Sequence, residues 1–433
     1  MRTRHNGRRG LAAAAVAASA LLAAACSSSG SSGGGTPASS ASGTQASSAS
    51  GTIRLFMLST FKPALDPVIA DFEKAYPAIH VNVQYVPPGT SYPDTLTTEI
   101  NGGNAPDVFY TNPGYVQMGS ASLLTLAKDG KVADLTSQSW SGDVPQIARS
   151  GFELNGKVYG LPLGGASSGL IYNETEFAKL GLKPPTTFSG VLQLCRTIKA
   201  DGKIPIALPG QFGAFLPLSL AMSSVYVTNP DWDSQLAAGK TTFAGTAGWQ
   251  TAMQEVSQMN SAGCFQPGAV SSTTSQAFQL AASGQALMYA GPTGALGALQ
   301  APGVTFGAFP IAAGSTTSTR VMSAFGDAMA VTAGSAHEAA AIQFVDYLAG
   351  PDVATPLANK AGDISVAQAN SGQLPTSMTA FASYFQQDKT VAFPSWLGAG
   401  QLVSLSTAVQ QVLNGGQGSV TSALQGVDRS LQS

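Results

Sequence analysis

The sequence predicts an α/β fold with two lobes, on three observations. The chain has 433 residues, which is more than one ordinary domain holds and suits two lobes with a core each. From Thr52 onward, patterns typical of strands and helices alternate. Beyond the N-terminus, no uninterrupted apolar run is long enough to span a bilayer. We therefore expect a body that folds in water rather than in lipid.

The composition excludes several classes of protein. The formal net charge is -2 and only 10% of residues are charged, so no basic surface is available to bind nucleic acid. The chain has three histidines, one of them in its first ten residues, which is too few for the usual metal sites. No cofactor, metal or nucleic-acid partner is therefore expected.

The first 25 residues indicate an export signal. An arginine-rich start is followed by the apolar stretch Leu11–Leu22 and by the small residues Ala23–Ala25. This order is typical of a signal peptide over residues 1–25, with cleavage before Cys26. The segment resembles bacterial lipoprotein signals, in which that cysteine is lipidated; the alternative is ordinary cleavage that leaves a free thiol. The pair Arg8-Arg9 raises twin-arginine export as a second route.

Residues 26–51 are expected to form the anchor and a tether. After Cys26, the stretch Ser27–Gly51 is almost wholly Ser, Gly, Ala and Thr, and it has no periodic apolar face. A flexible spacer directly after an anchoring cysteine allows a folded body to stand off a membrane. We expect a secreted protein that is anchored to the outer face of the cytoplasmic membrane through Cys26.

Two cysteines remain for the folded body, Cys195 and Cys264. An exported protein reaches an oxidising compartment, in which a disulfide persists. We hypothesise that these two cysteines pair, and the alternative is two buried free thiols.

The first part of the body predicts a βαβ unit. Ile53–Leu58 is a short apolar strand, and Asp66-Pro67 offers a helix N-cap followed by proline in the first turn. Apolar residues continue at helical spacing until Pro77 ends the helix. Ile79–Tyr85 then alternates apolar and polar residues, as a half-buried strand does. A strand, a helix and a second strand imply a parallel, right-handed unit.

Further elements extend this pattern. Thr95–Ile100 has helical spacing, and Val108–Tyr110 predicts another strand. Towards the far end, Ser335 and Glu338 form a capping box that opens a helix, which Gly350-Pro351 ends.

Five blocks of sequence follow one another in an order that indicates the class of protein. They are Phe72–Val83 with Asn101-Gly102-Gly103-Asn104-Ala105-Pro106-Asp107-Val108, Gly156–Pro162, Leu170–Asn173 with Phe177 and Pro184–Thr187, Phe278–Gly291, and Ala339–Pro351. In this order they resemble the family 1 extracellular solute-binding proteins, which are the maltose-binding-like receptors of ABC importers. The resemblance covers essentially all of residues 52–433.

This resemblance implies a two-lobed, periplasmic-binding-protein-like fold whose lobes are discontinuous in sequence and joined by hinge strands. Lobe 1 is expected to hold residues 52–163 and 311–350, and lobe 2 residues 164–310 and 351–433. The ligand cleft would lie between the lobes and close around a small molecule. The family implies a monomeric receptor, not an enzyme, that captures a small carbohydrate and delivers it to an ABC permease.

Candidate ligand-binding residues follow two of the predicted strands. In open α/β sheets, ligands bind beyond the carboxyl ends of strands, which selects Ser59, Thr60 and Phe61 after the first strand. The same rule selects Tyr110 and Asn112 at the end of the strand led by Asp107. Hydroxyl and carboxamide groups suit sugar hydroxyls, and aromatic faces suit the apolar side of a pyranose. For each polar residue the alternative is a side chain that stabilises a turn.

There are four further candidates, and three of them, Ser167, Phe215 and Trp396, rest on the resemblance. Ser167 lies in Gly164–Gly169, which is expected to be a loop that touches ligand. Phe215 follows the strand Ile204–Leu208, and Asp327 could accept hydrogen bonds from hydroxyls. Trp396 lies in a loop expected near the mouth of the cleft. Each of these could instead serve packing or a turn.

One position departs from the family pattern. Many sugar-binding relatives have Trp after a Gly-Pro or similar pair, whereas this chain has Thr293 after Gly291-Pro292. A stacking platform is therefore expected to be missing there, which leaves the size of the ligand open.

Other functions compete with the carbohydrate receptor. Gly165-Ala166-Ser167-Ser168-Gly169 matches the G-x-S-x-G pattern of serine hydrolases, in which the serine lies between a strand and a helix. Here Leu170–Tyr172 predicts a strand instead, which disfavours a hydrolase. The other solutes considered are polyamines, ferric iron and oligopeptides. A polyamine would require several carboxylates, and Asp327 is the one that the candidate loops supply. A purely adhesive or structural role would require no cleft.

Overall fold

The structure is a computed structural model that describes residues 49–87, 91–113, 118–299, 302–314, 319–394, 396 and 399–431. The expected signal peptide, Cys26 and nearly all of the tether lie outside these residues. Within the described residues, no helix is both long and apolar enough to cross a membrane.

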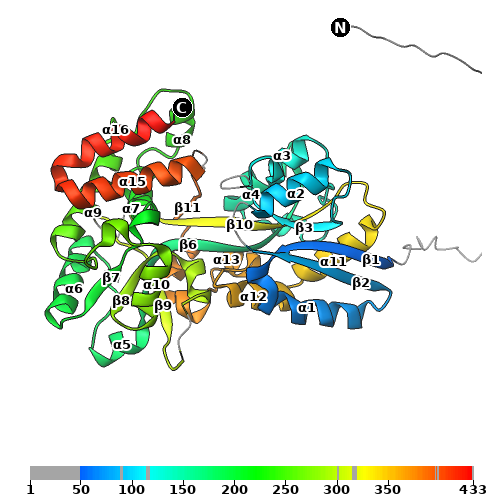
Figure 1. Ribbon diagram of the computed structural model, residues 1–433, viewed down its shortest axis with the longest axis horizontal. Coiled ribbons are helices and arrows are strands. Elements are labelled where there is room, and N and C mark those ends of the chain that lie inside the picture. The colour runs from blue at the N-terminus through cyan, green and yellow to red at the C-terminus, as the bar shows by residue number, and fades with distance from the viewer. Residues whose placement is uncertain are drawn as a thin grey trace, which may run out of the picture. The chain divides into compact units, whose positions relative to one another are not determined.

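A mixed sheet runs through the whole described body (Figure 1). Its strands lie in the order β2-β1-β3-β10-β6-β8-β7, with β11 paired to β10 and β9 paired to β6, and β4 and β5 form a separate pair. The strands are β1 Gly51–Leu58, β2 Ile79–Val86, β3 Val108–Thr111, β4 Glu153–Leu154, β5 Lys157–Val158, β6 Leu161–Asn173, β7 Ile204–Ala207, β8 Ala286–Pro292, β9 Phe306–Phe309, β10 Val321–Val331 and β11 Thr390–Ala392.

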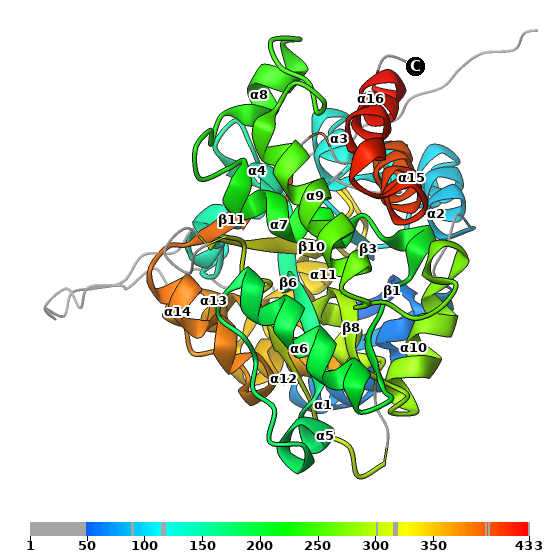
Figure 2. The same cartoon turned by 90° about the vertical axis from the view of Figure 1, so that its left-hand side faces the viewer.

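Helices cover this sheet at both of its ends, and Figure 2 looks onto the end that carries α6, α9 and α10. The helices are α1 Lys62–Ala75, α2 Ser91–Asn101, α3 Leu123–Lys128, α4 Gln146–Phe152, α5 Glu174–Lys179, α6 Phe188–Ala200, α7 Phe215–Ser224, α8 Trp232–Ala237, α9 Ala247–Ser261, α10 Thr274–Ala282, α11 Glu338–Ala349, α12 Pro351–Ala361, α13 Val366–Ser371, α14 Ala382–Gln386, α15 Ala399–Gly415 and α16 Val420–Ser430.

The predicted βαβ unit is confirmed, but its helix starts earlier than expected. β1 and β2 pair in parallel from Gly51 opposite Ile79. Helix α1 begins at Lys62 with Pro63 in its first turn, so Pro67 lies inside the helix rather than at its start. Pro67 has no N–H for the carbonyl of Pro63 four residues earlier, and Lys360 Nζ donates to that oxygen instead at 2.5 Å. This outside donor compensates for the proline inside the helix, which the sequence pattern places in the first turn after an Asp66 N-cap.

Two long strands, β6 and β10, cross between the lobes (Figure 1). They pair antiparallel, with Ser323 opposite Ser167 and Asp327 opposite Gly164, and the register shifts on either side of Asp327. Gly164–Gly169 is therefore part of a continuous strand and not the expected loop. Gly169 is required there because a Cβ would lie 2.4 Å from the carbonyl oxygen of Phe309.

Two large apolar cores flank this crossing, as the predicted two-lobed α/β fold requires. One core holds β1, β3, α1 and α11, and the other holds α6, α7, α9, α15 and α16. Ile311 packs in the second core and Leu357 in the first. We propose the expected lobe boundaries with α12 assigned to lobe 1 and the segment before β10 to lobe 2.

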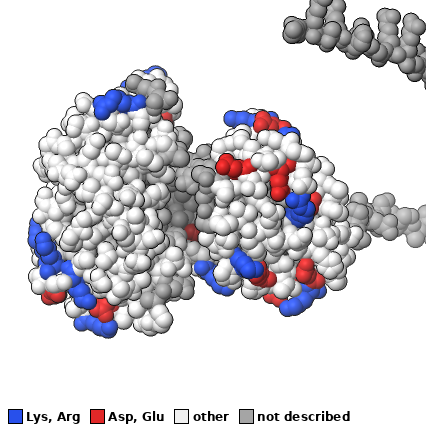
Figure 3. Space-filling view, in the orientation of Figure 1, with Lys and Arg blue, Asp and Glu red and all other residues white. Residues whose placement is uncertain are grey.

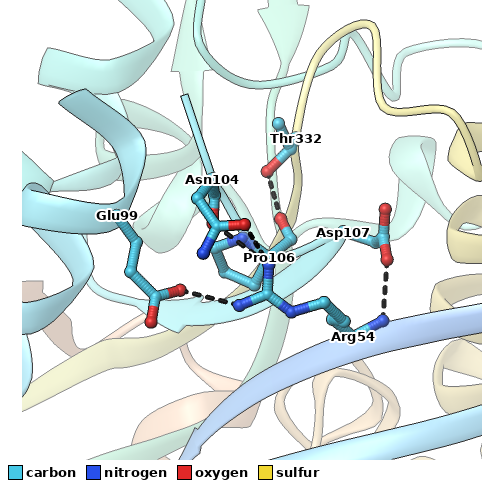
Figure 4. Close-up of polar contacts among 6 residues, drawn as sticks. All are labelled: Arg54, Glu99, Asn104, Pro106, Asp107 and Thr332. Atoms are coloured by element: carbon cyan, nitrogen blue, oxygen red, sulfur yellow. Dashed lines mark hydrogen bonds and ion pairs between the residues drawn. The ribbon is translucent and has the colours of Figure 1, made fainter. Parts of the chain in front are cut away.

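The Asn104–Asp107 segment belongs to a hydrogen-bond network at the edge of lobe 1 (Figure 4). The backbone N–H of Arg54 donates to the Asp107 carboxylate at 2.7 Å, and the hydroxyl of Ser335 donates to its other oxygen. The Arg54 guanidinium donates to Asn104 Oδ1 at 3.2 Å and to Glu99 Oε2 at 3.0 Å. The network joins β1, α2, the start of β3 and the segment after β10. The Asn-Ala-Pro-Asp motif is therefore structural in this protein.

The same contacts explain why the expected capping box is wrong. The Ser335 hydroxyl binds Asp107 and accepts from His337 N at 3.0 Å, so it does not cap α11. The Glu338 carboxylate accepts from Gly334 N at 2.6 Å rather than from Ser335. The Ser335 hydroxyl is instead bound to Asp107, which lies more than 200 residues away in sequence.

Replacing Asp107 with alanine should lower the free energy of unfolding by about 3 kcal/mol. Asp107 is only 8% exposed, and its loss leaves the Arg54 N–H and the Ser335 hydroxyl without their acceptor. Urea denaturation followed by circular dichroism measures this. The control is Asp71→Ala, which removes an exposed ion pair with Lys74 and should change stability by less than about 0.5 kcal/mol. Equal effects of the two variants would contradict the assigned role of Asp107.

A disulfide joins Cys195 in α6 to Cys264 after α9, with Cα atoms 5.0 Å apart. The hypothesised pair is thus present in the structure. Beside it, the side chain of Gln266 accepts from Leu208 N at 2.8 Å and donates to Leu208 O at 2.7 Å. These contacts hold the end of β7, from which the chain turns towards α7.

Candidate functional site

Two adjoining cavities lie where β6 and β10 cross, between the two cores. The smaller has a volume of about 310 Å³, and its lining includes Asn112, Ser167, Phe215, Asp327, Asp363 and Phe393. The larger has a volume of about 560 Å³, and its lining includes Thr60, Phe61, Pro292, Asp327, Lys360 and Asp363. Both lobes contribute, and Figure 3 shows a constriction between them. This shared hollow is hereafter called the cleft.

Asp327 lines the cleft, and Tyr110 contacts it from the neighbouring strand. Tyr110 is near the end of β3, which pairs with β10, and its hydroxyl donates to Asp327 Oδ1 at 2.5 Å. The irregular register of β10 around Asp327 lets this carboxylate leave the regular alternation of the strand. Burial raises the pKa of Asp327, although the Tyr110 hydroxyl opposes that shift. Burial also raises the pKa of Tyr110 well above its usual value.

A second carboxylate, Asp363, joins them from the segment after α12. Gly362 ends α12 in the left-handed region at φ 87°, and Ile364 then pairs with Gly165 of β6. Asp363 is 8% exposed, and its carboxylate makes no side-chain hydrogen bond to any described residue. Burial raises its pKa well above the usual value, and the neighbouring charge of Asp327 adds to this.

Ser167 lies in the wall of the smaller cavity but inside β6. Its backbone N–H donates to Thr293 Oγ1 at 2.8 Å, while its own buried hydroxyl has no hydrogen-bond partner among the described residues. Thr293 occupies the position at which a stacking tryptophan is missing, and it is fully buried. Its side chain instead holds strand β6 through this hydrogen bond. Because Ser167 lies mid-strand, it lacks the strand-to-helix turn that a hydrolase nucleophile requires.

Aromatic rings form another part of the cleft. Phe215 begins α7 and packs against Phe212 with ring centroids 5.3 Å apart. Phe393 lines the same cavity and was missed by sequence reasoning, although it lies three residues from the predicted Trp396. From lobe 1, Phe61 lines the larger cavity and lies 5.8 Å from the ring of Tyr110.

Trp396 was expected near the mouth of the cleft, but it lines neither cavity in the structure. Its indole N–H donates to the Tyr226 hydroxyl at 3.0 Å. Its ring packs edge-on against Trp232, Phe243 and Trp249, at 4.8 to 6.1 Å between centroids. This aromatic cluster belongs to the core of lobe 2.

The remaining sequence candidates divide between the two cavities. Asn112 lines the smaller one, and Thr60 lines the larger one. Ser59 opens the short helix Ser59–Phe61 and lines neither. The described residues contain no cluster of three or more His, Cys, Asp or Glu side chains suited to a metal ion.

The sequence profile of bacterial extracellular solute-binding proteins matches residues 59–355. The chain belongs to this family. The two-lobed fold expected from the resemblance is also confirmed by a solved structure, RafE in complex with raffinose. That structure has a TM-score of 0.71 and 21% identity, and the match covers 89% of this chain and all of RafE.

Two curated relatives are similar over part of their length. The multiple sugar-binding protein of Streptococcus mutans is 32% identical over 164 residues, which is 38% of this chain and 37% of that protein. The melibiose/raffinose/stachyose-binding protein MelE of Bacillus subtilis is 28% identical over 224 residues, which is 49% of each chain. This chain therefore matches less than half the length of these relatives.

Proposed function

We propose that this protein is an extracytoplasmic receptor that captures a small carbohydrate in the cleft and delivers it to an ABC permease. The observation that carries this proposal is the convergence of Asp327, Asp363 and Phe215 on one cavity, with Tyr110 holding Asp327 from the neighbouring strand. Carboxylates accept hydrogen bonds from sugar hydroxyls, and a phenyl ring packs on the apolar face of a pyranose. Relatives named for binding sugars support the same reading.

The proposed mechanism is closure of the lobes around the ligand. The solute first contacts one lobe, and the binding energy then shifts an open–closed equilibrium towards the closed form. The strands β6 and β10 connect the lobes and carry Ser167 and Asp327 into the cleft, so movement at the crossing would move the ligand contacts too. The receptor performs no chemistry in this scheme, and the closed form is what the permease recognises.

Export and anchoring belong to the same proposal. Residues 1–25 would direct export, and lipidated Cys26 with its tether would hold the receptor at the outer face of the membrane. A monomer that reaches the permease on a flexible spacer needs no further membrane segment.

Isothermal titration with monosaccharides, disaccharides, amino acids and spermidine tests the function. We expect heat from at least one saccharide, and Phe215→Ala should weaken that binding about tenfold, because a ring contact worth ~1.4 kcal/mol is lost. The matched control is Phe212→Ala, which removes the adjacent ring that lines neither cavity. Heat from spermidine or amino acids alone would refute a carbohydrate receptor.

A further inference from the structure

Two carboxylates from separate elements converge over one glycine of the crossing strand. Asp327 lies opposite Gly164 in the pairing of β10 with β6. Asp363 covers the same glycine, because a Cβ on Gly164 would lie 2.8 Å from the Cβ of Asp363. Both side chains line both cavities. The cleft is therefore built around a pair of acidic groups.

No cationic side chain among the described residues is paired with these two carboxylates. The groups that face the pair are Tyr110 from β3 and Lys360 from α12. The Tyr110 hydroxyl donates to Asp327, whereas the Lys360 ammonium is directed to the carbonyl of Pro63 at 2.5 Å. Asp363 receives no hydrogen bond from a described side chain. The described residues therefore form no ion pair with either acid, although Lys360 lines the larger cavity with them.

Two ionised carboxylates in one buried cavity repel each other, and desolvation adds to the cost. A neutral sugar can donate hydroxyls to them but brings no compensating charge. An ammonium group brings both a charge and three donors. We infer that the carbohydrate bound here carries a protonated amine that lies between Asp327 and Asp363, and this inference rests on the proposed function.

The rest of the cleft favours an amino sugar over an aliphatic polyamine. Phe215 and Phe393 offer apolar faces of the kind that pack on a pyranose ring. Ser167 adds a buried hydroxyl without a partner in the wall of the same cavity, and a ring hydroxyl can satisfy it. A flexible alkyl chain offers neither a rigid face nor additional hydroxyls to this wall.

Binding of an amine in the cleft should depend on pH. Because burial raises the pKa of both acids, and the charge of Asp327 raises the pKa of Asp363 further, the empty cleft retains a proton to a higher pH than ordinary carboxyls do. An ammonium ligand favours the ionised pair and displaces that proton. Affinity for the amine should therefore rise with pH until the amine itself loses its proton, whereas a neutral sugar should show no such rise.

Titration calorimetry of the full receptor with a β-1,4-linked glucosamine disaccharide and its N-acetylated counterpart tests the inference. We expect the amine to bind at least about tenfold more tightly at neutral pH, and Asp363→Asn to remove that preference. The control variant is Asp201→Asn, an exposed acid that lines neither cavity and should leave the preference unchanged.

Thermal unfolding shows whether the Asp363→Asn variant is folded. A buried carboxyl with a raised pKa destabilises the folded state once pH exceeds its ordinary pKa, so the amide should melt no lower than the wild type at neutral pH. A carbohydrate that binds without amine preference, or a preference that survives Asp363→Asn, overturns the amine inference and leaves the carbohydrate receptor intact. If neither glucosamine disaccharide binds but another mono- or disaccharide does, the amine inference alone fails; if no saccharide binds at all, both proposals fail.

Discussion

Replacing both Cys195 and Cys264 with alanine should lower the free energy of unfolding of lobe 2 by about 4 kcal/mol. The two cysteines are 69 residues apart, and a crosslink that closes a loop of this length restricts the unfolded chain by about that amount. Both side chains are fully buried in the core of lobe 2. The double variant therefore loses the crosslink without exposing a polar group.

Urea denaturation followed by tryptophan fluorescence measures this change where it arises. Trp232, Trp249 and Trp396 all lie in lobe 2, and Trp140 lies in the core of lobe 1. The wild type and the double variant should both carry Cys26→Ser, so that no third thiol can form a disulfide. Wild type under reducing conditions should match the double variant, whereas reductant should not affect the variant. A difference below about 1 kcal/mol would mean that the crosslink does not stabilise this lobe.

The disulfide also bears on the cleft through the end of β7. Ile206 N donates to Cys264 O at 2.8 Å, and Gln266 then holds both backbone groups of Leu208. Seven residues further on, Phe215 reaches the cleft. Loss of the crosslink should therefore loosen the position of Phe215 before it unfolds the lobe.

The strand-end rule predicted part of the cleft from sequence. Asn112 lines it because β3 ends there, Asp327 lines it because β10 crosses to the same edge, and Tyr110 of β3 contacts Asp327. The hydrogen bond between Tyr110 and Asp327 spans 217 residues of sequence, so local pattern alone could not join them. The strand-end rule indicates which residues lie at the binding edge of the sheet. Tertiary packing determines which of their side chains meet.

Three features of this region could not be predicted from sequence, because they depend on tertiary contacts. Asp363 follows a helix rather than a strand, and the glycine before it signals only a helix end. Trp396 was assigned to the cleft from its place in a loop, but the ring is drawn into the aromatic core by three neighbouring rings. Gly164–Gly169 was expected to be a loop because of the family resemblance. In the structure they allow close approach of Asp363, Phe325 and Phe309 to a strand.

The family motif that precedes β3 is structural, whereas a candidate ligand contact lies near the end of the same strand. Asn104 and Asp107 lie at the amino end of β3 and tie together four segments of lobe 1. Tyr110, three residues further on, lies at the cleft. One strand thus carries a structural anchor at its start and a candidate ligand contact at its end. This arrangement explains why a motif can indicate the family without containing the binding site.

Replacing Trp232 with alanine should lower the free energy of unfolding of lobe 2 by about 4 kcal/mol, because a fully buried ring leaves a large cavity. The ring contacts Tyr226, Phe243, Trp249 and Trp396, so its loss removes support from the whole aromatic cluster. It lines neither cavity of the cleft. Ligand affinity of the folded variant should therefore stay within about twofold of wild type.

Replacing a tryptophan with phenylalanine keeps an aromatic ring but removes the indole N–H, so it separates the contribution of packing from that of the hydrogen bond. The Trp232 indole donates to Thr246 Oγ1 at 2.9 Å, whereas the buried Trp249 indole N–H has no partner among the described residues. Trp232→Phe should therefore cost about 1 to 2 kcal/mol more than Trp249→Phe, because only the first loses a hydrogen bond. Urea denaturation followed by circular dichroism compares them without relying on tryptophan emission. Equal costs would show that packing alone, and not the hydrogen bond to Thr246, fixes Trp232 in the core that supports the cleft.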